Sequence, residues 1–217
     1  MKSIPIPLLL VLLITSLAAC TSTGARTATP EPVAEIAPGM LQGYLTEEEL
    51  LDSKIFVPPA PAADSARQEL DDAVSANTEA LRGTERWQLA ARDADLSFPA
   101  AADTFSCALG IRVNETDTPW LYMLLHRTLT DIGLSPYSAK NLYKRERPFM
   151  LKGDQTCTPD DEEALRKDGS YPSGHTAVGW GWALILTELQ PDRAEEILAR
   201  GRAFGESRNV CNAHWYS

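Results

Sequence analysis

The helical periodicity that runs from Asp64 to the end of the chain constrains the fold more than any other sequence feature. Apolar residues recur there at spacings of three and four, the pattern of helices that bury one face. Convincing alternation of apolar and polar residues, which would predict strands, is absent from this sequence. We therefore expect an all-α fold, a single helical-bundle domain of at least six helices.

Proline, glycine and capping residues mark the expected helix boundaries. A hydroxyl residue followed by proline is typical of a helix start, because the hydroxyl caps free N–H groups and proline has no N–H to satisfy. Thr118-Pro119 and Ser135-Pro136 both have this form. The first of these helices should end at Gly133 and the second before Pro148. The other expected helices cover 64–81, a segment beginning at 84, 177–189 and a segment from 191 towards 208.

The first 20 residues have the pattern of an export signal. Lys2 precedes an apolar run that is too short, and wrongly flanked, for a stable membrane span. The run ends in Leu-Ala-Ala-Cys20, which resembles a bacterial lipobox with Cys20 as the lipidated residue. The alternative is a plain secretory signal with an incidental cysteine. We expect a lipoprotein on the periplasmic face of the outer membrane, held only by its lipid, or else a soluble periplasmic protein.

The remaining chain divides into two parts. Residues 21–60 contain irregular stretches rich in Pro and Ala, so we expect a flexible tether there and the domain over 61–217. The net charge of −10 disfavours nucleic acid as a partner. An anionic substrate would need a site that concentrates positive charge locally.

One segment with such charge lies before Pro148. Lys140 and Arg147 are seven residues apart, so two helical turns should place them on one helix face. Alone, the segment is typical of a solvated basic helix end. We interpret Lys144 and Arg145 in that way.

A second segment, Gly169–Thr176, reads Gly-Ser-Tyr-Pro-Ser-Gly-His-Thr. Free N–H groups at the start of the apolar helix that follows form a ready seat for an anion. Ser173 can add a hydroxyl donor, Gly174 permits close approach, and His175 lies in the first turn. The alternative is an ordinary capped helix whose histidine faces solvent.

The third segment, Ser207–His214, carries Arg208 and His214 six residues apart. They lie close to one face if the helix is bent or tightened, although such residues near a helix end are usually on the surface. The chain has three histidines, and two of them fall in these segments. We expect the third, His126, to be structural or to face solvent.

In order, the segments read Lys-x6-Arg-Pro, Pro-Ser-Gly-His and Ser-Arg-x5-His. This resembles the superfamily of type 2 phosphatidic acid phosphatases and vanadium haloperoxidases. Gly169–Thr176 is similar to the signature of the bacterial class A non-specific acid phosphatases, and the similarity runs from Pro59 to Ser217. The resemblance implies hydrolysis of small phosphate monoesters at acidic pH, without metal or cofactor. Its partners would be such esters and inorganic phosphate, and a homo-oligomer is compatible with the sequence.

The resemblance also implies residue roles. His214 would be the nucleophile that forms a phosphohistidine, and His175 would be the general acid and base. The phosphate would be bound by Lys140, Arg147, Ser173, Gly174 and Arg208.

The sequence departs from the family pattern at one position. That pattern continues with an Asp four residues after the nucleophile, and the sequence ends at Ser217. We expect a C-terminally truncated domain that lacks the last helix of the family. A haloperoxidase, a lipid phosphatase of the same superfamily and a non-catalytic phosphate-binding lipoprotein stay as alternatives.

Three cysteines follow the expected signal, and an exported protein could join two of them. Spacing does not fix the pairing. Cys157 and Cys211 each lie near one of the motifs, so we favour that pair and expect Cys107 to be the free thiol.

Overall fold

The structure, a computed structural model, describes residues 29–217. The expected signal peptide and Cys20 lie outside the described residues. The all-α prediction is confirmed, since helices dominate the described chain. In residues 29–217, strand structure is limited to the antiparallel hairpin of β1 (Glu35–Ala37) and β2 (Met40–Leu41).

The helical elements follow one another in chain order. They are η1 (Ser53–Ile55), α1 (Ala66–Glu79), α2 (Glu85–Ala94), α3 (Ala100–Asp103), α4 (Ser106–Leu109), α5 (Pro119–Leu134), α6 (Tyr137–Tyr143), α7 (Pro148–Lys152), η2 (Pro159–Asp161), α8 (Glu162–Leu165), α9 (Gly174–Leu189), η3 (Pro191–Arg193) and α10 (Ala194–Val210).

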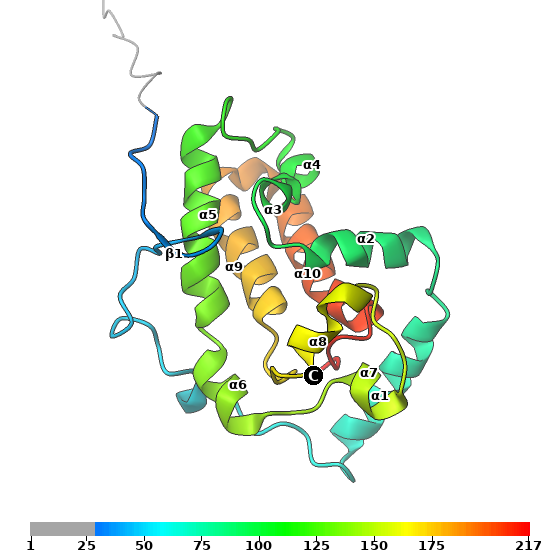
Figure 1. Ribbon diagram of the computed structural model, residues 1–217. Coiled ribbons are helices and arrows are strands. Elements are labelled where there is room, and N and C mark those ends of the chain that lie inside the picture. Colours follow the sequence, from blue (N-terminus) through cyan, green and yellow to red (C-terminus); the bar gives the residue numbers. More distant parts are fainter. Residues whose placement is uncertain (1–28) are drawn as a thin grey trace, which may run out of the picture.

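Helix α9 lies at the centre of the bundle, between α5 and α10 (Figure 1). Its contact with α10 is unusually close, because a Cβ on Gly201 would lie 2.7 Å from the Gly179 carbonyl oxygen. Near the pocket, a Cβ on Gly205 would lie 3.0 Å from the Thr176 side chain. The start of α9 is therefore held against the end of α10, and these two ends carry His175 and Arg208.

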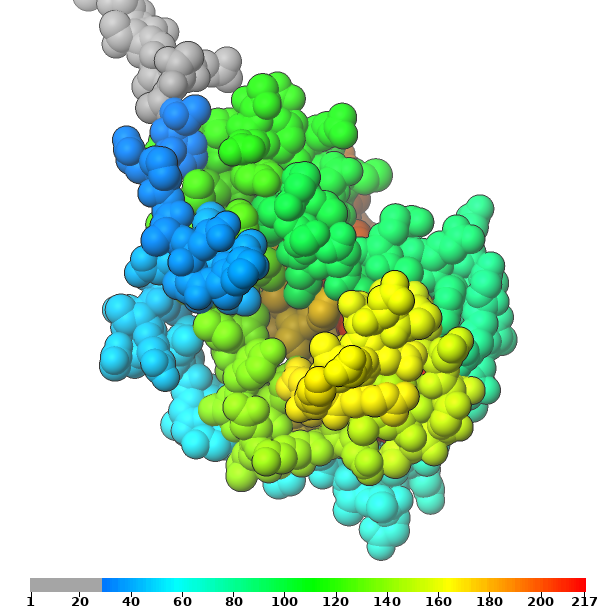
Figure 2. All heavy atoms as spheres, in the orientation of Figure 1, coloured from blue at the N-terminus to red at the C-terminus, as the bar shows by residue number. Residues whose placement is uncertain are grey.

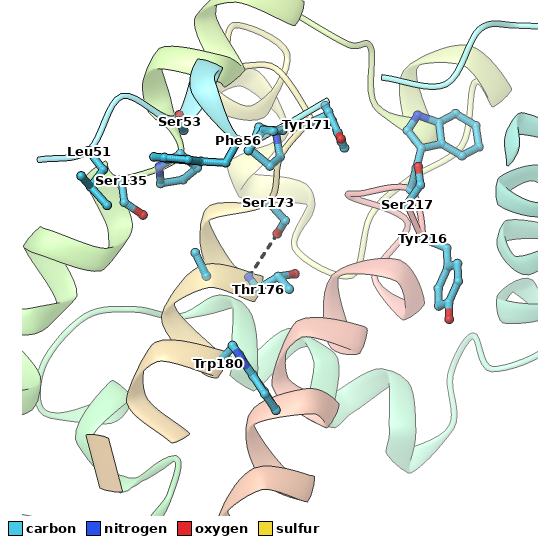
Figure 3. A pocket seen from close by; sticks show the side chains of 15 residues that line it. Leu51, Ser53, Phe56, Ser135, Tyr171, Ser173, Thr176, Trp180, Tyr216 and Ser217 are labelled. Carbon is cyan, nitrogen blue, oxygen red and sulfur yellow. Dashed lines mark hydrogen bonds between the residues drawn. The ribbon is translucent and has the colours of Figure 1, made fainter. Parts of the chain in front are cut away.

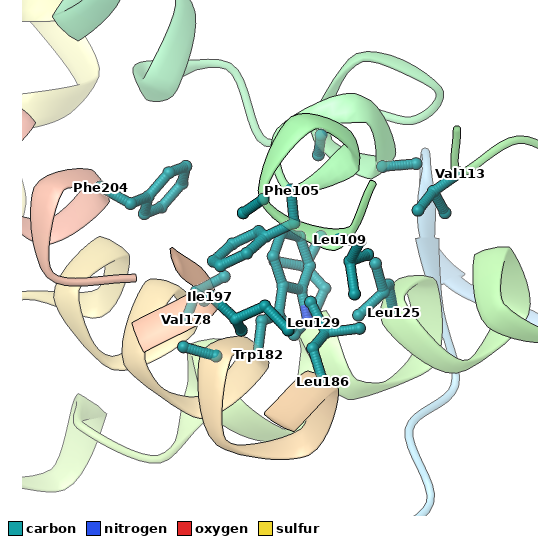
Figure 4. Close-up of a cluster of buried hydrophobic side chains, with 14 residues drawn as sticks. Phe105, Leu109, Val113, Leu125, Leu129, Val178, Trp182, Leu186, Ile197 and Phe204 are labelled. Carbon is teal, nitrogen blue, oxygen red and sulfur yellow. The ribbon is translucent and has the colours of Figure 1, made fainter. Parts of the chain in front are cut away.

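The main core packs between α5, α9 and α10 (Figure 4). Trp182 on α9 is fully buried there, and its Nε1 donates to Thr128 Oγ1 at 3.2 Å. A buried indole needs such a partner, so the bond satisfies its polar atom while its rings supply apolar contact. The side chains packed around it include Phe105, Leu125, Val178, Leu186, Ile197 and Phe204.

Part of the segment expected to be a tether packs on the bundle instead. Thr130 Oγ1 donates to the Leu41 carbonyl at 2.6 Å, and the Tyr44 N–H donates to Asp131 Oδ2 at 2.8 Å. Further along, Ser53 and Ser138 share a hydrogen bond of 2.8 Å.

The prediction of a flexible tether over 21–60 is therefore wrong for residues 41–53. Its basis was a composition without periodicity, whereas the bonds come from polar groups on α5 and α6 that are distant in sequence. The other proposed boundaries stay predictions.

The stretch around Lys144 also differs from expectation. Helix α6 ends at Tyr143, because Lys144 takes a left-handed conformation with φ of 44°. Pro148 opens α7 rather than ending a helix, since proline suits the first position, where no N–H bond is required. Arg145 is not a solvated residue, because its side chain is 9% exposed and its NH2 donates to Asp71 Oδ2 at 2.6 Å.

Among residues 29–217, no helix has both the length and the apolar character needed to cross a membrane.

Candidate active site

A pocket of about 450 Å³ lies where the three motifs meet. Figure 2 shows a hollow between the blue hairpin segment and the yellow residues around α8, with gold residues of α9 at its floor. Six of the predicted site residues line this pocket: Lys140, Arg147, Gly174, His175, Arg208 and His214.

Lys140 and Arg147 reach the pocket from two elements rather than from one helix. Lys140 lies in the last turn of α6, whereas Arg147 is the extended residue that precedes α7. The prediction of a shared helix face is wrong, because the left-handed Lys144 turns the chain between them. The two side chains nevertheless converge in the tertiary structure.

Arg147 is buried and held by a full set of acceptors. Its guanidinium nitrogens bond to the carbonyl oxygens of Leu165, Asp168, Gly169 and Ala213, to His214 Nε2 and to Asp168 Oδ2. A guanidinium has five N–H donors in one plane, so these bonds fix its orientation. Burial lowers the pKa of Arg147, and Asp168 opposes that shift.

Asp168 is a pocket residue that the sequence reasoning missed. Its Oδ2 lies 2.9 Å from Lys140 Nζ and 3.4 Å from Arg147 NH2. The pKa of Lys140 is lowered mainly by burial, while the bond to Asp168 acts in the opposite direction. Asp168 directly precedes the Gly169–Thr176 motif, and this adjacency was the one available signal.

Arg208 differs from the other two cations of the pocket. It is 2% exposed, and its Nε and NH1 have no hydrogen-bond partner among residues 29–217. Burial, followed by the nearby Arg147 charge, lowers the pKa of Arg208 to about 10. A buried charge without a partner is strongly unfavourable, so its guanidinium indicates a place for an anion.

His214 is turned back into the pocket after α10 ends. Asn212 has φ of 61°, and the His214 N–H donates to the Arg208 carbonyl at 3.1 Å. The prediction that Arg208 and His214 share a helix is wrong, since a left-handed residue rather than a tightened helix brings them together.

The hydrogen bonds of the His214 ring define its tautomer. Arg147 NH1 donates to Nε2 at 2.9 Å, so Nε2 carries the lone pair. Nδ1 then carries the proton and donates to the Ser170 carbonyl. Burial lowers the pKa of His214 well below its ordinary value of 6.5, and the charges of Arg147 and Arg208 add to the effect. The ring is therefore neutral, with a nitrogen lone pair at the cation cluster.

The Ser170 carbonyl is a second group that the sequence did not reveal, because a backbone acceptor leaves no side-chain signal. Through its bond to Nδ1 it orients the imidazole of His214.

A disulfide between Cys157 and Cys211, the pair favoured from the sequence, secures this region. The Cys157 N–H also donates to the Cys211 carbonyl at 3.2 Å. The bridge therefore joins the end of α10 to the loop before α8. Cys107 is free and exposed.

His175 occupies the first turn of α9, as predicted. Its Nε2 bonds to the Ala94 carbonyl at 3.0 Å, and its ring stacks 6.1 Å from that of Phe204. Burial and then the Arg208 charge lower the pKa of His175 well below 6.5. The ring is thus neutral near pH 7, and a nearby anion would favour its protonation.

Ser173 is the predicted phosphate ligand whose side chain does not line this pocket. Its Oγ accepts the Thr176 N–H at 3.2 Å and caps α9 (Figure 3). The side chain lines a neighbouring groove of about 530 Å³ together with Trp180 and Tyr216. In this structure, helix capping therefore accounts for the Ser173 hydroxyl.

An apolar wall faces the cations, and the hairpin contributes to it. It includes Pro38, Met40, Leu96, Leu129, Leu134 and Val178. His126 supports the hairpin turn, because its Nε2 bonds to the Gly39 carbonyl at 3.1 Å and its ring stacks 3.9 Å from Phe98. His126 thus has a structural role, one of the two that the sequence left open.

In the part of the chain that the structure describes, no three His, Cys, Asp or Glu side chains are grouped as metal ligands would be. The pocket instead gathers Lys140, Arg147 and Arg208, opposed by the carboxylate of Asp168. Such a site can bind a tetrahedral anion through charge-assisted hydrogen bonds.

Comparisons with known proteins agree with this chemistry. The family model of the PAP2 superfamily matches residues 120–217. A non-specific acid phosphatase of Salmonella typhimurium is 43% identical over 178 residues, covering 82% of this chain and 71% of the relative. One of Providencia stuartii is 43% identical over 175 residues, with coverage of 80% and 71%. An acid phosphatase of Zymomonas mobilis is 44% identical over 170 residues, with coverage of 76% and 63%. The chain therefore belongs to the class A acid phosphatases of the PAP2 superfamily, and it is a phosphatase.

Proposed function

We propose that this phosphatase hydrolyses small phosphate monoesters through a covalent phosphohistidine on His214, with protein cations neutralising the transferred phosphoryl group. The observation that carries the proposal is the pairing of two features in one pocket. Arg208 has buried N–H donors without a partner among the described residues, and His214, whose Nε2 lone pair accepts from Arg147 NH1, lines the same pocket.

The cations supply the electrostatic part of catalysis. A transferring phosphoryl group spreads negative charge over its equatorial oxygens, and fixed positive groups stabilise that charge. Lys140, Arg147 and Arg208 line the pocket together with His214, and Arg147 NH1 donates to His214 Nε2 at 2.9 Å. The N–H groups at the start of α9, beginning with Gly174, add the positive end of a helix dipole. We propose that these groups do the work that metal ions do in other phosphatases.

The first chemical step transfers the phosphoryl group to His214. The Nε2 lone pair attacks phosphorus, an N–P bond forms, and the bond from phosphorus to the ester oxygen breaks. That oxygen takes a proton from His175 and leaves as an alcohol. Because Nε2 of His175 donates to the Ala94 carbonyl, we assign the transferred proton to Nδ1.

The second step releases phosphate. Neutral His175 accepts a proton from water while the water oxygen attacks phosphorus. The N–P bond breaks, and its electron pair returns to His214 Nε2. The Ser170 carbonyl holds the Nδ1 proton throughout, so the ring stays in one orientation and tautomer.

This scheme predicts an acidic optimum. His175 must be protonated to act as the acid, and burial together with Arg208 lowers its pKa. Lowering the pH, and binding an anion beside it, both restore the imidazolium. We expect kcat/KM to be greatest below pH 7. A maximum above about pH 8 would contradict the role of His175.

The decisive experiment follows p-nitrophenyl phosphate hydrolysis with excess chelator. We expect chelator resistance, and loss of roughly 10³-fold or more in kcat for His214→Ala. His126→Gln, which alters the third histidine, serves as the matched control. Rapid acid-free quenching and mass spectrometry should place a phosphoryl group on the peptide that contains His214. A phosphoryl group elsewhere, or full activity of His214→Ala, would exclude this nucleophile.

We also propose that residues 1–20 direct export and that Cys20 is lipidated. The support is the apolar run and the Leu-Ala-Ala-Cys20 ending. Detergent phase partitioning of the protein expressed in bacteria, compared with Cys20→Ser, tests it. A wild-type protein that stays in the aqueous phase would indicate a soluble periplasmic form.

A further inference from the structure

Asp168 is the one acidic side chain among the described residues that line the pocket. A single oxygen atom, Oδ2, contacts both Lys140 Nζ at 2.9 Å and Arg147 NH2 at 3.4 Å. A phosphate oxygen bound between the same two cations would make the same kind of contact. The carboxylate and a phosphate therefore require the same donors.

One hydrogen bond of Arg147, the one to the Asp168 carboxylate, is the easiest to break. Its other contacts are to backbone carbonyls and to His214 Nε2, with distances from 2.8 to 3.2 Å. The contact to Asp168 Oδ2, at 3.4 Å, is the longest in the set. The side chain of Asp168 is also 31% exposed, whereas those of Lys140 and Arg147 are 4% and 1% exposed. Replacing the Asp168 carboxylate by a phosphate oxygen thus requires less rearrangement than replacing any other partner of Arg147.

The backbone around Asp168 is fixed while its carboxylate has access to solvent. The Asp168 carbonyl accepts from Arg147 Nε at 3.1 Å, and the Ser170 N–H donates to the Arg145 carbonyl at 2.8 Å. A Cβ on Gly169 would lie 3.1 Å from the Lys140 carbonyl oxygen, so the loop packs tightly on the end of α6. Rotation of the side chain alone can therefore release the two cations.

We propose that Asp168 is an internal competitor of phosphate: its carboxylate holds Lys140 and Arg147 and turns towards solvent when a phosphate oxygen takes its place. This inference rests on the proposed function. The competition weakens the apparent affinity for substrate and product by the fraction of molecules in which the cations are free. It also favours release of inorganic phosphate after each turnover. Asp168 is a positioning residue, because it acts through the two cations and not on the reacting atoms.

The test compares Asp168→Asn with the wild type. Asparagine keeps the shape and can still accept from Lys140, but it removes the negative charge. We expect the inhibition constant of inorganic phosphate and the KM for p-nitrophenyl phosphate to fall together by about tenfold, with kcat within about threefold. Asp168→Glu retains the charge and should stay within about threefold of the wild type. Glu163→Gln removes an exposed carboxylate of the neighbouring helix α8 and should change neither constant.

If Asp168 had a purely structural role, its replacement by Asn would not lower the inhibition constant of inorganic phosphate. If Asp168→Asn leaves the inhibition constant unchanged or raises it, the competition is excluded. If the Tm of that variant falls by more than about 5 °C, Asp168→Ser is titrated with inorganic phosphate by calorimetry instead. A Kd equal to or above that of the wild type then excludes the competition. The proposed function fails separately: hydrolysis without a phosphoryl group on His214 would contradict the nucleophile, and the inhibition constants would still decide on Asp168.

Discussion

Two arginines on α10, Arg200 and Arg208, lie about two turns apart and have opposite surroundings. Arg200 bonds to Asp93 through NH1 at 3.2 Å and through NH2, and its Nε donates to the Thr104 carbonyl at 3.0 Å. Arg208 has Nε and NH1 without partners among residues 29–217. One cation is neutralised within the fold, whereas the other keeps its donors for a ligand.

Ser207, the neighbour of Arg208 in the sequence, belongs to the neutralised group. Its Oγ donates to Asp93 Oδ2, and Arg86 NH1 donates to the same hydroxyl at 3.0 Å. The Ser-Arg pair of the motif thus divides between the fold and the site. A buried ion pair is costly to break, and an unpaired buried charge is costly to keep. The comparison teaches that only Arg208 needs a functional explanation.

The largest expected effect comes from Arg208→Met. Removal of a donor that acts on the transferred phosphoryl group should lower kcat/KM for p-nitrophenyl phosphate by roughly 10³-fold. Because an unpaired buried charge is removed as well, Tm should stay the same or rise. Steady-state kinetics and thermal unfolding check both parts. A large fall in Tm would show that Arg208 is a structural cation like Arg200.

Arg200→Met should give the converse result. It leaves Asp93, which is 2% exposed, without its charged partner, and we expect a loss of about 3 kcal/mol in the free energy of unfolding. For a domain of this size, Tm should fall by roughly 8 °C. The folded fraction of this variant should have a kcat/KM within about fivefold of the wild-type value. If activity falls as it does for Arg208→Met, the proposed division between the two arginines is wrong.

The stabilisation of the protein by inorganic phosphate should also distinguish Arg208 from Arg200. At 100 times its Kd, a ligand that binds only the folded state stabilises it by about 2.7 kcal/mol. The Tm of the wild type should therefore rise by roughly 5 to 8 °C. Arg200→Met should keep this rise, and Arg208→Met should lose most of it. Equal rises in both variants would place the anion away from Arg208.

The smallest effect concerns pH. Burial lowers the folded-state pKa values of His175 and His214 well below 6.5, so on acidification the unfolded chain takes up these protons first. These histidines do not affect stability above that range, and they reduce it as the pH falls through 6.5.

Arg208 contributes to both shifts, so Arg208→Met should raise both pKa values. The fall in Tm between pH 7 and pH 5 should then become smaller by roughly 2 °C, with Arg200→Met unchanged. Differential scanning calorimetry at the two pH values measures this. An equal fall in all three proteins would show that Arg208 does not act on the histidines.

The comparison also explains which features could be predicted. The signature residues Lys140, Arg147, His175 and Arg208 were identified because each motif carries side chains with distinctive chemistry. Ser173 was assigned to the anion, but its hydroxyl caps α9, a competing role with the same sequence signal. Asp168 was missed because a single acidic residue before a motif is uninformative until its distance to two cations is known.

Helix patterns had a similar limit. Local signals predicted α9, which Ser173 caps, and the start of α5, where proline takes the first position although the Thr118 hydroxyl makes no capping bond. They failed at Lys144 and Asn212, whose left-handed backbones redirect the chain. They also failed for residues 41–53, which are held by polar groups of distant helices.

The sequence by itself determined the helical class, the family and the side chains available for phosphate chemistry, because periodicity and motif spacing are local properties. Only the tertiary structure decided which cations have partners, which histidine nitrogen carries the lone pair and which carbonyl holds that ring. These properties depend on hydrogen bonds between groups far apart in the chain. Burial raises the free-energy cost of each donor that has no partner. The distinction between Arg200 and Arg208, two arginines on one helix, therefore exists only in the folded molecule.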